Sequence, residues 1–460
     1  MEQLKDGSLL RLGRQFGVSS PPLGVSGEFE HFDLGLRVGA FRNAMREANE
    51  QLIPARLGLT VQLPFCSSLC YHCARMKKVT RNARLMSTYV DALCREMREK
   101  SELVDQDRLV DQVWFVGGSP LYLGNAVLGR VMAQIAESFS ISGSTRRYFF
   151  IELDARTATP QHVAQLSMLG INALRLWVPA MSPSVQKTIN RQQSTEALSS
   201  LVMASRRTSY RDVTLATRIG LPMQSLESLV VDVDWFGDLG PDNLIVERYQ
   251  HRPGLNAAQR LIPRNLLPEV ERVDEMEQVA YERLELAGYH HLGLGHFTRD
   301  DSVLYKARQE GNLQRGLLGY MAGAGAHMLG FGAGAVSRLE DRLFRAPNDL
   351  ESYMRSVDDG DLAIGSGVAL DRAQLRASFV VERILCDGIC READWSACFD
   401  ISFDRYVEAL MPYIDRLILD GKLKSDARSL TLTASGRKSL DEVVDCFERS
   451  LSDDTVLSLH

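Results

Sequence analysis

The sequence predicts an α/β fold, because short apolar runs alternate with segments that have helical spacing through the middle of the chain. Residues with versatile chemistry also lie at the ends of the first three of these runs. Three cysteines follow the first run, two glycines follow the second, and two carboxylates lie near the end of the third. In a parallel sheet the carboxyl ends of the strands meet at one edge, so these motifs are expected to converge. The sequence therefore predicts a parallel sheet covered by helices, with a site at that edge.

The apolar runs place six strands with helices between them. Strands are expected at 59–65, 112–116, 148–153, 173–178, 213–219 and 244–249. Helices are expected at 86–103, 126–139, 161–169, 194–205 and 225–236. A linker-like stretch with three prolines, 253–268, precedes a charged helix over 269–287.

The ends of the chain differ from this alternating region. Residues 1–58 are expected to form an N-terminal extension, with a loop of turn-forming residues over 16–27 followed by an amphipathic helix. From about residue 370 the pattern returns to helices and a short strand pair, which resembles a winged-helix-like domain. The expected domains are the extension, a barrel over 59–300, a glycine-rich part of that barrel over 301–368, and a mostly helical C-terminal domain over 369–460.

One segment raises the question of a membrane span. Residues 317–336 carry no formal charge over twenty positions, which is long enough to cross a bilayer. Six of them are glycine, and His327 lies in the middle. A buried region of turns and strands is the preferred interpretation, and no contact with a membrane is expected.

Composition excludes several classes of protein. The net charge of -6 provides no footprint for nucleic acid, whose binding proteins are usually basic. Eight cysteines among 460 residues do not indicate a disulfide scaffold, and no secretory signal is visible at the N-terminus. These observations predict a cytoplasmic protein with 45% hydrophobic and 24% charged residues, ordinary values for a folded chain.

Cys66, Cys70 and Cys73 form the strongest motif, C-x3-C-x2-C, on a short loop after the first strand. Three thiolates so close together suit zinc or an iron–sulfur cluster. A zinc site would need a fourth ligand, whereas a cubane cluster held by three cysteines leaves one iron open for a small molecule. A second run, C-x3-C-x7-C at Cys386, Cys390 and Cys398, is expected to consist of buried or incidental thiols.

The cysteine loop and its flanks resemble a known family. C-x3-C-x2-C after a first strand is similar to the signature of radical S-adenosylmethionine (radical SAM) enzymes, and PFC, LCYHC and KKVTR resemble oxygen-independent coproporphyrinogen III dehydrogenases. Further matches are GGSP, ELDA, INRQQ, IGLP, GHF, LGYM, GFGAGAVS and TASGR. The resemblance implies an open (β/α)6 partial TIM barrel and a [4Fe–4S] cluster on the three cysteines. Its open iron would bind SAM, whose reductive cleavage produces a 5′-deoxyadenosyl radical.

The resemblance also implies roles for residues at the ends of the second to fourth strands and beyond. Gly117, Gly118 and Ser119 stand where the family lets the backbone approach the methionine part of SAM. Glu152 and Arg191 match positions that contact SAM. A small-molecule substrate and an electron donor such as a flavodoxin or ferredoxin are the implied partners, and no catalytic residue is assigned.

Several positions depart from the family pattern beside these matches. Thr60 and Gln62 stand in place of a tyrosine and a histidine before PFC, and Arg75 replaces a fourth cysteine that is not a cluster ligand. Pro179 and Ala216 replace a glutamine and an aspartate of the SAM pocket. Other departures affect a second SAM site and the substrate-covering parts, at His72, Leu317, Leu318, residues 21–28, Leu440 and Asp441.

These departures favour one bound SAM and a radical SAM enzyme that abstracts hydrogen from a small organic substrate other than coproporphyrinogen III. The alternatives are coproporphyrinogen III dehydrogenation itself, a related radical SAM methyltransferase or cyclopropanase, and a non-catalytic heme chaperone.

Overall fold

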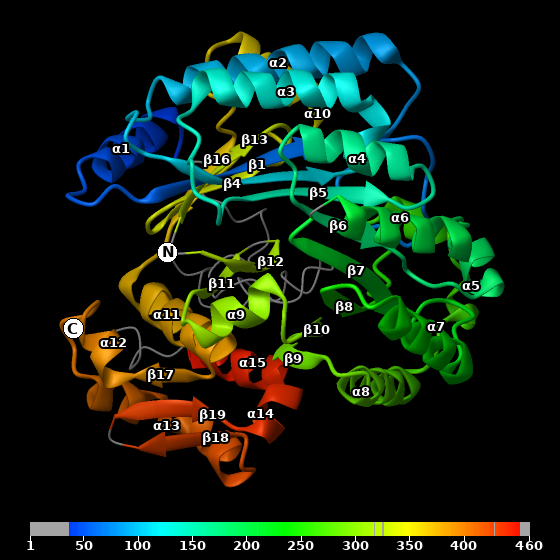
Figure 1. Ribbon diagram of the computed structural model, residues 1–460. Coiled ribbons are helices and arrows are strands. Elements are labelled where there is room, and N and C mark those ends of the chain that lie inside the picture. Colours follow the sequence, from blue (N-terminus) through cyan, green and yellow to red (C-terminus); the bar gives the residue numbers. More distant parts are fainter. Residues whose placement is uncertain (1–35, 209, 317, 324–325, 427, 451–460) are drawn as a thin grey trace. The chain divides into compact units, whose positions relative to one another are not determined.

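A curved sheet with helices on its outer side dominates the structure, a computed structural model that describes residues 36–450 except 209, 317, 324–325 and 427 (Figure 1). The predicted loop over 16–27 and the substrate-covering segment 21–28 lie outside the described residues. Six parallel strands correspond to the six predicted ones: β1 (Arg56–Leu63), β4 (Val110–Gly117), β5 (Tyr148–Asp154), β6 (Ala173–Trp177), β7 (Asp212–Ile219) and β8 (Asn243–Arg248).

The strand order in this region is β1-β4-β5-β6-β7-β8, and each neighbouring pair is parallel. Every residue of β5 and β7 is buried, as expected for strands covered on both faces. Because each strand is followed by a helix on the outer side, the six units form the predicted partial (β/α)6 barrel. The carboxyl ends of the strands consequently lie along one rim.

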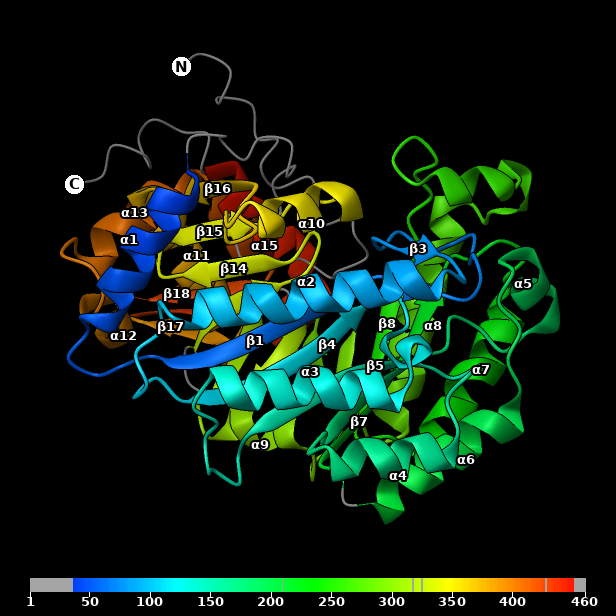
Figure 2. The ribbon, with the colours of Figure 1, turned by 90° about the horizontal axis from the view of Figure 1, so that it is seen from above.

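The helices between the strands begin at local capping signals. Asn82, Ser194 and Ser225 each accept a hydrogen bond from the backbone at the start of α2, α6 and α7. Helices α2 and α3 lie side by side over β1 and β4 (Figure 2). The bounds are α2 (Ala83–Ser101), α3 (Asn125–Ser138), α4 (Pro160–Met168), α5 (Pro183–Thr188), α6 (Thr195–Arg207), α7 (Leu226–Leu239) and α8 (Val270–Leu286).

The glycine-rich segment enters the main sheet as a strand. In it, β13 (Ala326–Phe331) pairs in parallel with β1. An antiparallel meander then adds β14 (Val336–Leu339), β15 (Arg342–Arg345) and β16 (Ser366–Ala369), with α10 (Leu350–Asp358) between the last two. Turns and strands, rather than one long helix, therefore occupy the described part of 317–336. Among the described residues no helix is both long and apolar enough to cross a bilayer.

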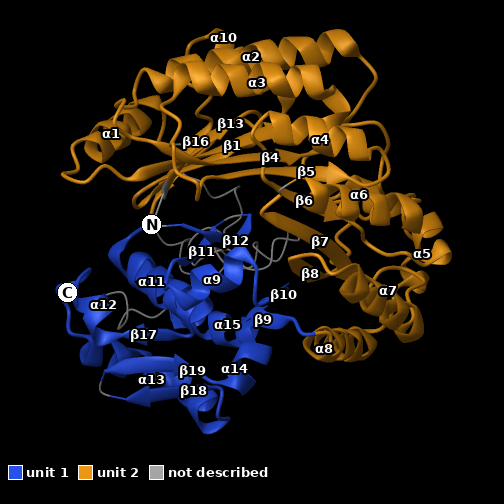
Figure 3. Cartoon of the chain, in the orientation of Figure 1, with its two compact units in different colours: residues 1–31, 288–324, 370–460 blue, residues 32–287, 325–369 orange. Residues whose placement is uncertain are grey.

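The chain divides into two compact units, which differ from the four expected segments (Figure 3). One unit comprises residues 32–287 and 325–369, and contains α1 (Val38–Asn49), the helix predicted in the N-terminal extension. The other comprises 1–31, 288–324 and 370–460. The strands after residue 325 extend the barrel sheet, whereas 288–324 belongs with the C-terminal helices.

The second unit has a core of its own. Trp395 and Tyr406 stack at its centre, with ring centroids 4.4 Å apart. Its C-terminal part has the helix, strand and wing order of a winged helix: α11 (Arg372–Asp387), β17 (Ile389–Arg391), α12 (Glu392–Ser396), α13 (Phe403–Leu419), β18 (Leu423–Asp426), β19 (Ser429–Leu432), α14 (Ala434–Lys438) and α15 (Leu440–Ser450). The preceding segment contains β9 (His290–Gly293), β10 (His296–Thr298), α9 (Val303–Gln309), β11 (Leu313–Gly316) and β12 (Gly319–Ala322).

Candidate functional site

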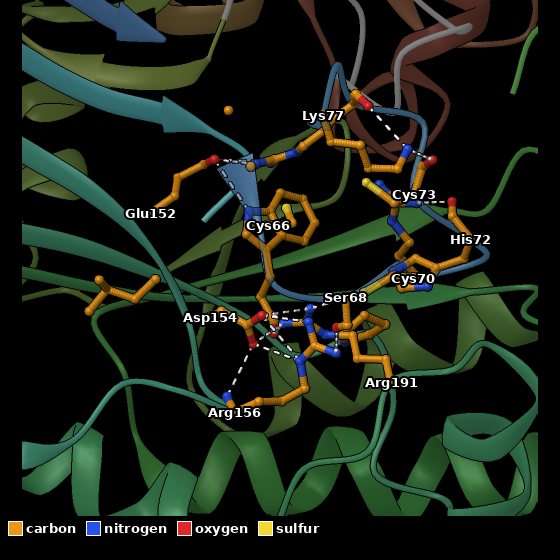
Figure 4. A pocket seen from close by; sticks show the side chains of 17 residues that line it. Cys66, Ser68, Cys70, His72, Cys73, Lys77, Glu152, Asp154, Arg156 and Arg191 are labelled. Atoms are coloured by element: carbon orange, nitrogen blue, oxygen red, sulfur yellow. Dashed lines mark hydrogen bonds and ion pairs between the residues drawn. The ribbon is translucent and has the colours of Figure 1, made fainter. Parts of the chain in front are cut away.

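One cavity collects the motifs from the carboxyl ends of the strands. It has a volume of about 70 Å³. Its lining contains all three cysteines of the C-x3-C-x2-C motif, and Figure 4 shows them on the loop above Asp154 and Arg191. The strand ends contribute Gly117, Gly118, Glu152, Leu153, Asp154, Trp177, Pro179 and Arg218. The predicted convergence of these motifs on one rim is what the structure shows.

The cysteine loop is held at both ends by backbone hydrogen bonds. Its first residue lies in β2 (Phe65–Cys66), which pairs in parallel with β3 (Lys78–Val79). In the middle, the Tyr71 amide donates to the Ile189 carbonyl at 2.9 Å. The Asn190 side-chain amide donates to the Leu69 carbonyl at 2.8 Å. These bonds position the loop without any contribution from its thiols, which remain available as ligands.

The donor set suits a cluster better than a single ion. Within the described part of the chain, no three His, Cys, Asp or Glu side chains lie close enough together to bind one metal ion. In a cubane each cysteine binds a different iron, so its sulfurs stand farther apart than the ligands of a single zinc. Three thiols on one wall of a cavity, without a fourth protein ligand, therefore fit a [4Fe–4S] cluster with one open iron.

The three thiols experience different electrostatic environments. Burial, together with the neighbouring Cys73 and Cys70, raises the pKa of Cys66 to about 12. Burial also acts to raise the pKa of Cys73, but the cations of Lys77 and Arg75 more than offset it and leave this pKa lowered. Bound iron replaces the proton on each thiol, so these pKa values describe the metal-free loop.

Gly117 and Gly118 are required for contact with the cysteine loop itself. A Cβ on Gly118 would lie 2.6 Å from the Phe65 carbonyl oxygen and 2.9 Å from the Cys66 sulfur. Gly117 has φ +116°, a conformation that favours glycine. The next residue, Ser119, is buried, and its hydroxyl has no hydrogen-bond partner among the described residues. The resemblance assigned these glycines to SAM, but in this structure they first serve the fit between β4 and the loop.

Asp154 is the centre of an ion-pair group below the loop (Figure 4). Arg156 binds its carboxylate through Nε at 3.0 Å and Nη2 at 2.6 Å, and Arg191 binds it through Nη2 at 3.0 Å. Burial acts to raise the pKa of Asp154, but the two guanidinium groups outweigh burial and lower it to about 2. Arg191 also lies 3.6 Å from the Cys70 sulfur, so this group places a cation directly beside the cluster loop.

Glu152 is fully engaged by protein groups. Arg75 donates from Nη2 to Oε1 at 2.9 Å and from Nη1 to Oε2. Oε1 also accepts from Trp177 Nε1 at 3.2 Å and from Arg175 Nη1 at 3.4 Å. Burial acts to raise the pKa of Glu152, yet Arg75 and Arg175 more than offset this and hold it below its usual value. The predicted SAM-contacting carboxylate therefore already has strong internal partners.

Trp177 carries cations on its ring. The guanidinium carbon of Arg75 lies 4.3 Å from the ring centroid, and that of Arg218 lies 5.5 Å from it. Arg218 also pairs with Glu247 at 3.4 Å and donates to the His72 carbonyl at 3.3 Å. The His72 ring is buried, and its Nδ1 has no partner among the described residues. In this conformation the His72 ring therefore packs inside the protein.

The cavity suits the cluster better than it suits SAM. Pockets for small molecules usually measure about 300–1,000 Å³, well above this cavity. Its lining contains five cationic side chains, Arg75, Lys77, Arg156, Arg191 and Arg218, against two carboxylates. SAM has a net positive charge, since its sulfonium and ammonium outweigh its carboxylate. In the conformation described, the three cysteines fit the cluster, whereas Glu152, the carboxylate expected to contact SAM, is already paired with Arg75.

The sequence predicted the metal loop and the rim but gave no role to Trp177 or to the two arginines of the strands beside it. Arg175 and Arg218 were assigned to strands and given no role, and Trp177 was treated as a strand residue. The available signal was an arginine within an otherwise apolar run of a doubly covered strand, because such a charge needs a buried partner. Of the three cysteines of the second run, Cys386 and Cys390 are buried and Cys398 is exposed.

Comparisons with known proteins connect this geometry to a family. The model of the radical SAM superfamily matches residues 61–236. An oxygen-independent coproporphyrinogen III oxidase from Pseudomonas aeruginosa is 32% identical over 409 residues, spanning 89% of this chain and 88% of that protein. The enzyme of the same name from Salmonella typhimurium is 32% identical and spans 86% of both chains. The solved structure of coproporphyrinogen III oxidase (HemN) from Escherichia coli, a radical SAM enzyme, has a TM-score of 0.86 at 29% identity, covering 91% of this chain and 95% of that one.

Proposed function

Because this chain belongs to the oxygen-independent coproporphyrinogen III oxidase family of radical SAM enzymes, we propose that it catalyses oxidative decarboxylation of coproporphyrinogen III. As a radical SAM enzyme it uses a [4Fe–4S] cluster and SAM as cofactors. The expectation that the substrate is not coproporphyrinogen III receives no support from the comparisons, in which full-length relatives carry that name. The proposed substrate is therefore the one that the names of these relatives give.

One observation carries this proposal: the cysteine loop lies at the carboxyl rim of a barrel that is related to the Escherichia coli enzyme along nearly its whole length. The relationship includes the C-terminal unit as well as the barrel. A shared cluster domain alone would indicate only the first chemical step, whereas relatedness over both units favours the same overall reaction.

The reaction converts a propionate side chain into a vinyl group. A hydrogen atom is removed from the carbon attached to the ring, the carboxylate leaves as carbon dioxide, and one further electron passes to an acceptor. SAM, when bound at the open iron, supplies the radical that removes the hydrogen. The cysteines hold the cluster, and Arg191 stands beside it together with Asp154.

An external electron donor completes the proposal. The cluster must be reduced before each cleavage of SAM, and a flavodoxin or ferredoxin is a suitable donor. A cytoplasmic location is consistent with such partners and with reduced cysteines. The substrate is a small molecule, and neither nucleic acid nor a membrane is needed.

The test is anaerobic turnover of the full-length, cluster-loaded protein with SAM, a reductant and coproporphyrinogen III. Mass spectrometry of the porphyrins after oxidation should detect loss of one and then two carboxyl groups. A Cys70→Ala variant serves as the matched control, because it lacks a cluster ligand. Absence of any decarboxylated product at saturating SAM and full cluster occupancy would contradict the proposed substrate.

A second candidate is a radical SAM reaction on another small organic molecule. Thr60 and Gln62 favour it, because they lie on the half-exposed face of β1, opposite the buried Leu59, Val61 and Leu63. Their non-aromatic side chains, a hydroxyl and an amide, replace the tyrosine and the histidine of the family on that face. Cleavage of SAM without porphyrin turnover would favour this candidate.

A further inference from the structure

We propose that Arg75 and Trp177 close the adenosyl side of the cofactor pocket, so that SAM must displace Arg75 from Glu152 in order to bind. This inference rests on family membership for the identity of the cofactor. It does not depend on which substrate is oxidised.

The Glu152 carboxylate is both the partner of Arg75 and the group expected to contact SAM. Glu152 lies at the rim, two residues before the Asp154 group that touches the cysteine loop through Arg191. It is the carboxylate expected to receive SAM, yet both of its oxygens accept hydrogen bonds from Arg75. A ribose hydroxyl or an ammonium group therefore competes directly with a bidentate guanidinium, one of the strong pairings available to a carboxylate.

The side chains of Arg75 and Trp177 occupy the space next to the Glu152 carboxylate. Trp177 fills the end of β6, and the guanidinium of Arg75 stacks on its ring at 4.3 Å. Both side chains line the cavity that contains the cysteine loop. An adenosyl group that approaches the Glu152 carboxylate therefore meets the guanidinium of Arg75 and the ring of Trp177.

Of these side chains, Arg75 is the one that can move away. Arg75 is on the loop after the cysteines, and about a quarter of its side chain is exposed to solvent (26%). Arg175, the other guanidinium on Glu152, is anchored on the buried strand β6, with only 9% of its side chain exposed. Arg75 can consequently leave toward solvent while Arg175 and Trp177 Nε1 continue to stabilise the carboxylate.

The positive charges around the Trp177 ring also affect the binding of SAM. Arg75 and Arg218 both lie on Trp177, and Arg175 is 6.0 Å from the same ring. Glu152 and Glu247 balance two of these three guanidinium charges, so a cofactor with net positive charge meets a group with one excess positive charge, which removal of Arg75 neutralises. Charge and space therefore have the same effect, a weaker affinity for SAM in the closed arrangement.

The test is SAM binding by equilibrium dialysis to the anaerobically reconstituted full-length protein, in wild type and in Arg75→Ala, Trp177→Ala and Arg75→Lys variants. The control is Arg248→Ala, at the end of β8, where the guanidinium pairs with Asp274 and Glu277 on α8. The electron paramagnetic resonance spectrum of the reduced cluster, recorded with SAM, gives a second readout that does not require turnover.

Arg75→Ala and Trp177→Ala are each expected to lower the dissociation constant for SAM at least tenfold. Arg75→Lys retains the charge and should change the constant less, while Arg248→Ala should leave it unchanged. Equal affinity in wild type, Arg75→Ala and Trp177→Ala at equal cluster content would overturn the inference, as would equal tightening by Arg248→Ala. The proposed substrate fails separately, if Arg75→Ala binds SAM tightly and cleaves it but leaves coproporphyrinogen III intact.

Discussion

Both oxygens of the Glu152 carboxylate accept hydrogen bonds from the two terminal nitrogens of Arg75. Trp177 lies below this pair and donates to the same carboxylate at 3.2 Å. The pair joins a strand end to the loop that carries the cluster ligands. Glu152, which matches a contact position of the family, is therefore paired with Arg75, which departs from the family. This pairing connects the stability of the rim with the binding of the cofactor.

Removal of Glu152 should destabilise the fold, because it leaves Arg75 and Arg175 without their counter-charge. Breaking a buried ion pair from one side typically costs about 3–5 kcal/mol. Glu152→Gln is expected to lower the free energy of unfolding by an amount in this range, measured by urea denaturation of the cluster-free protein. The double variant Glu152→Gln with Arg75→Gln should recover part of the loss, and an additive double variant would contradict the pairing.

Each cysteine of the first motif should be needed for the cluster. Cys66→Ala, Cys70→Ala and Cys73→Ala are each expected to lower bound iron and acid-labile sulfide strongly after anaerobic reconstitution, with loss of the visible absorbance. The control is Cys398→Ala, an exposed thiol in the C-terminal unit. Normal iron content in any of the first three variants would contradict the assignment of ligands.

Gly118→Ala should impair the cluster while the fold remains intact. The new methyl group would meet the Phe65 carbonyl oxygen at 2.6 Å and the Cys66 sulfur at 2.9 Å, so the loop must shift. Iron content should fall, while the far-ultraviolet circular dichroism spectrum stays close to wild type. Gly143→Ala is the matched control, since a Cβ there meets nothing within 4 Å. Full cluster content in Gly118→Ala would argue against this tight contact.

Asp212 predicts a pH-dependent stability at the opposite end of the barrel strands. Burial and the nearby Asp242 raise the pKa of Asp212 to about 6. The unfolded chain releases this proton near pH 4 and the folded protein only near pH 6, so stability falls as pH rises through this window. Asp212→Asn should therefore stabilise the protein above pH 6, by about 3 kcal/mol at most, and should have little effect near pH 4.

The measurement for Asp212 is urea unfolding of both proteins between pH 4 and pH 8. The asparagine can keep the hydrogen bonds from Thr214 and Asn243, which end on one oxygen, and can donate to the Tyr148 hydroxyl. The exposed Asp238 on α7 provides a control substitution, Asp238→Asn, for which no such trend is expected. A stability difference that is the same at all these pH values would contradict the account.

Much of the barrel was predictable from the sequence because each strand is a short apolar run between helices. All six predicted strands are present, with ends that differ by a few residues, and among the described α-helices between these strands α5 (Pro183–Thr188) is the one that the pattern did not indicate. A six-residue helix contains too few turns to produce a clear apolar periodicity. The cluster loop was also predictable, since its signal is a local spacing.

The filled pocket was not predictable, because it depends on contacts between distant segments. In the sequence, Arg75 replaces a family cysteine that is not a cluster ligand. The absence of that cysteine removes no ligand of the cluster. Only the fold brings it within hydrogen-bonding distance of Glu152, which is 77 positions away, and places Trp177 beneath both. Strand register and side-chain direction, which decide such contacts, are not local properties of the sequence.

The central claim is that this chain performs radical SAM chemistry on coproporphyrinogen III. The most direct test is to measure 5′-deoxyadenosine and decarboxylated porphyrin together, in one anaerobic reaction with reductant and SAM well above its dissociation constant. The account predicts that both products form in wild type and that neither forms in Cys70→Ala. A fully cluster-loaded wild-type protein that yields no 5′-deoxyadenosine and leaves coproporphyrinogen III unchanged would contradict it.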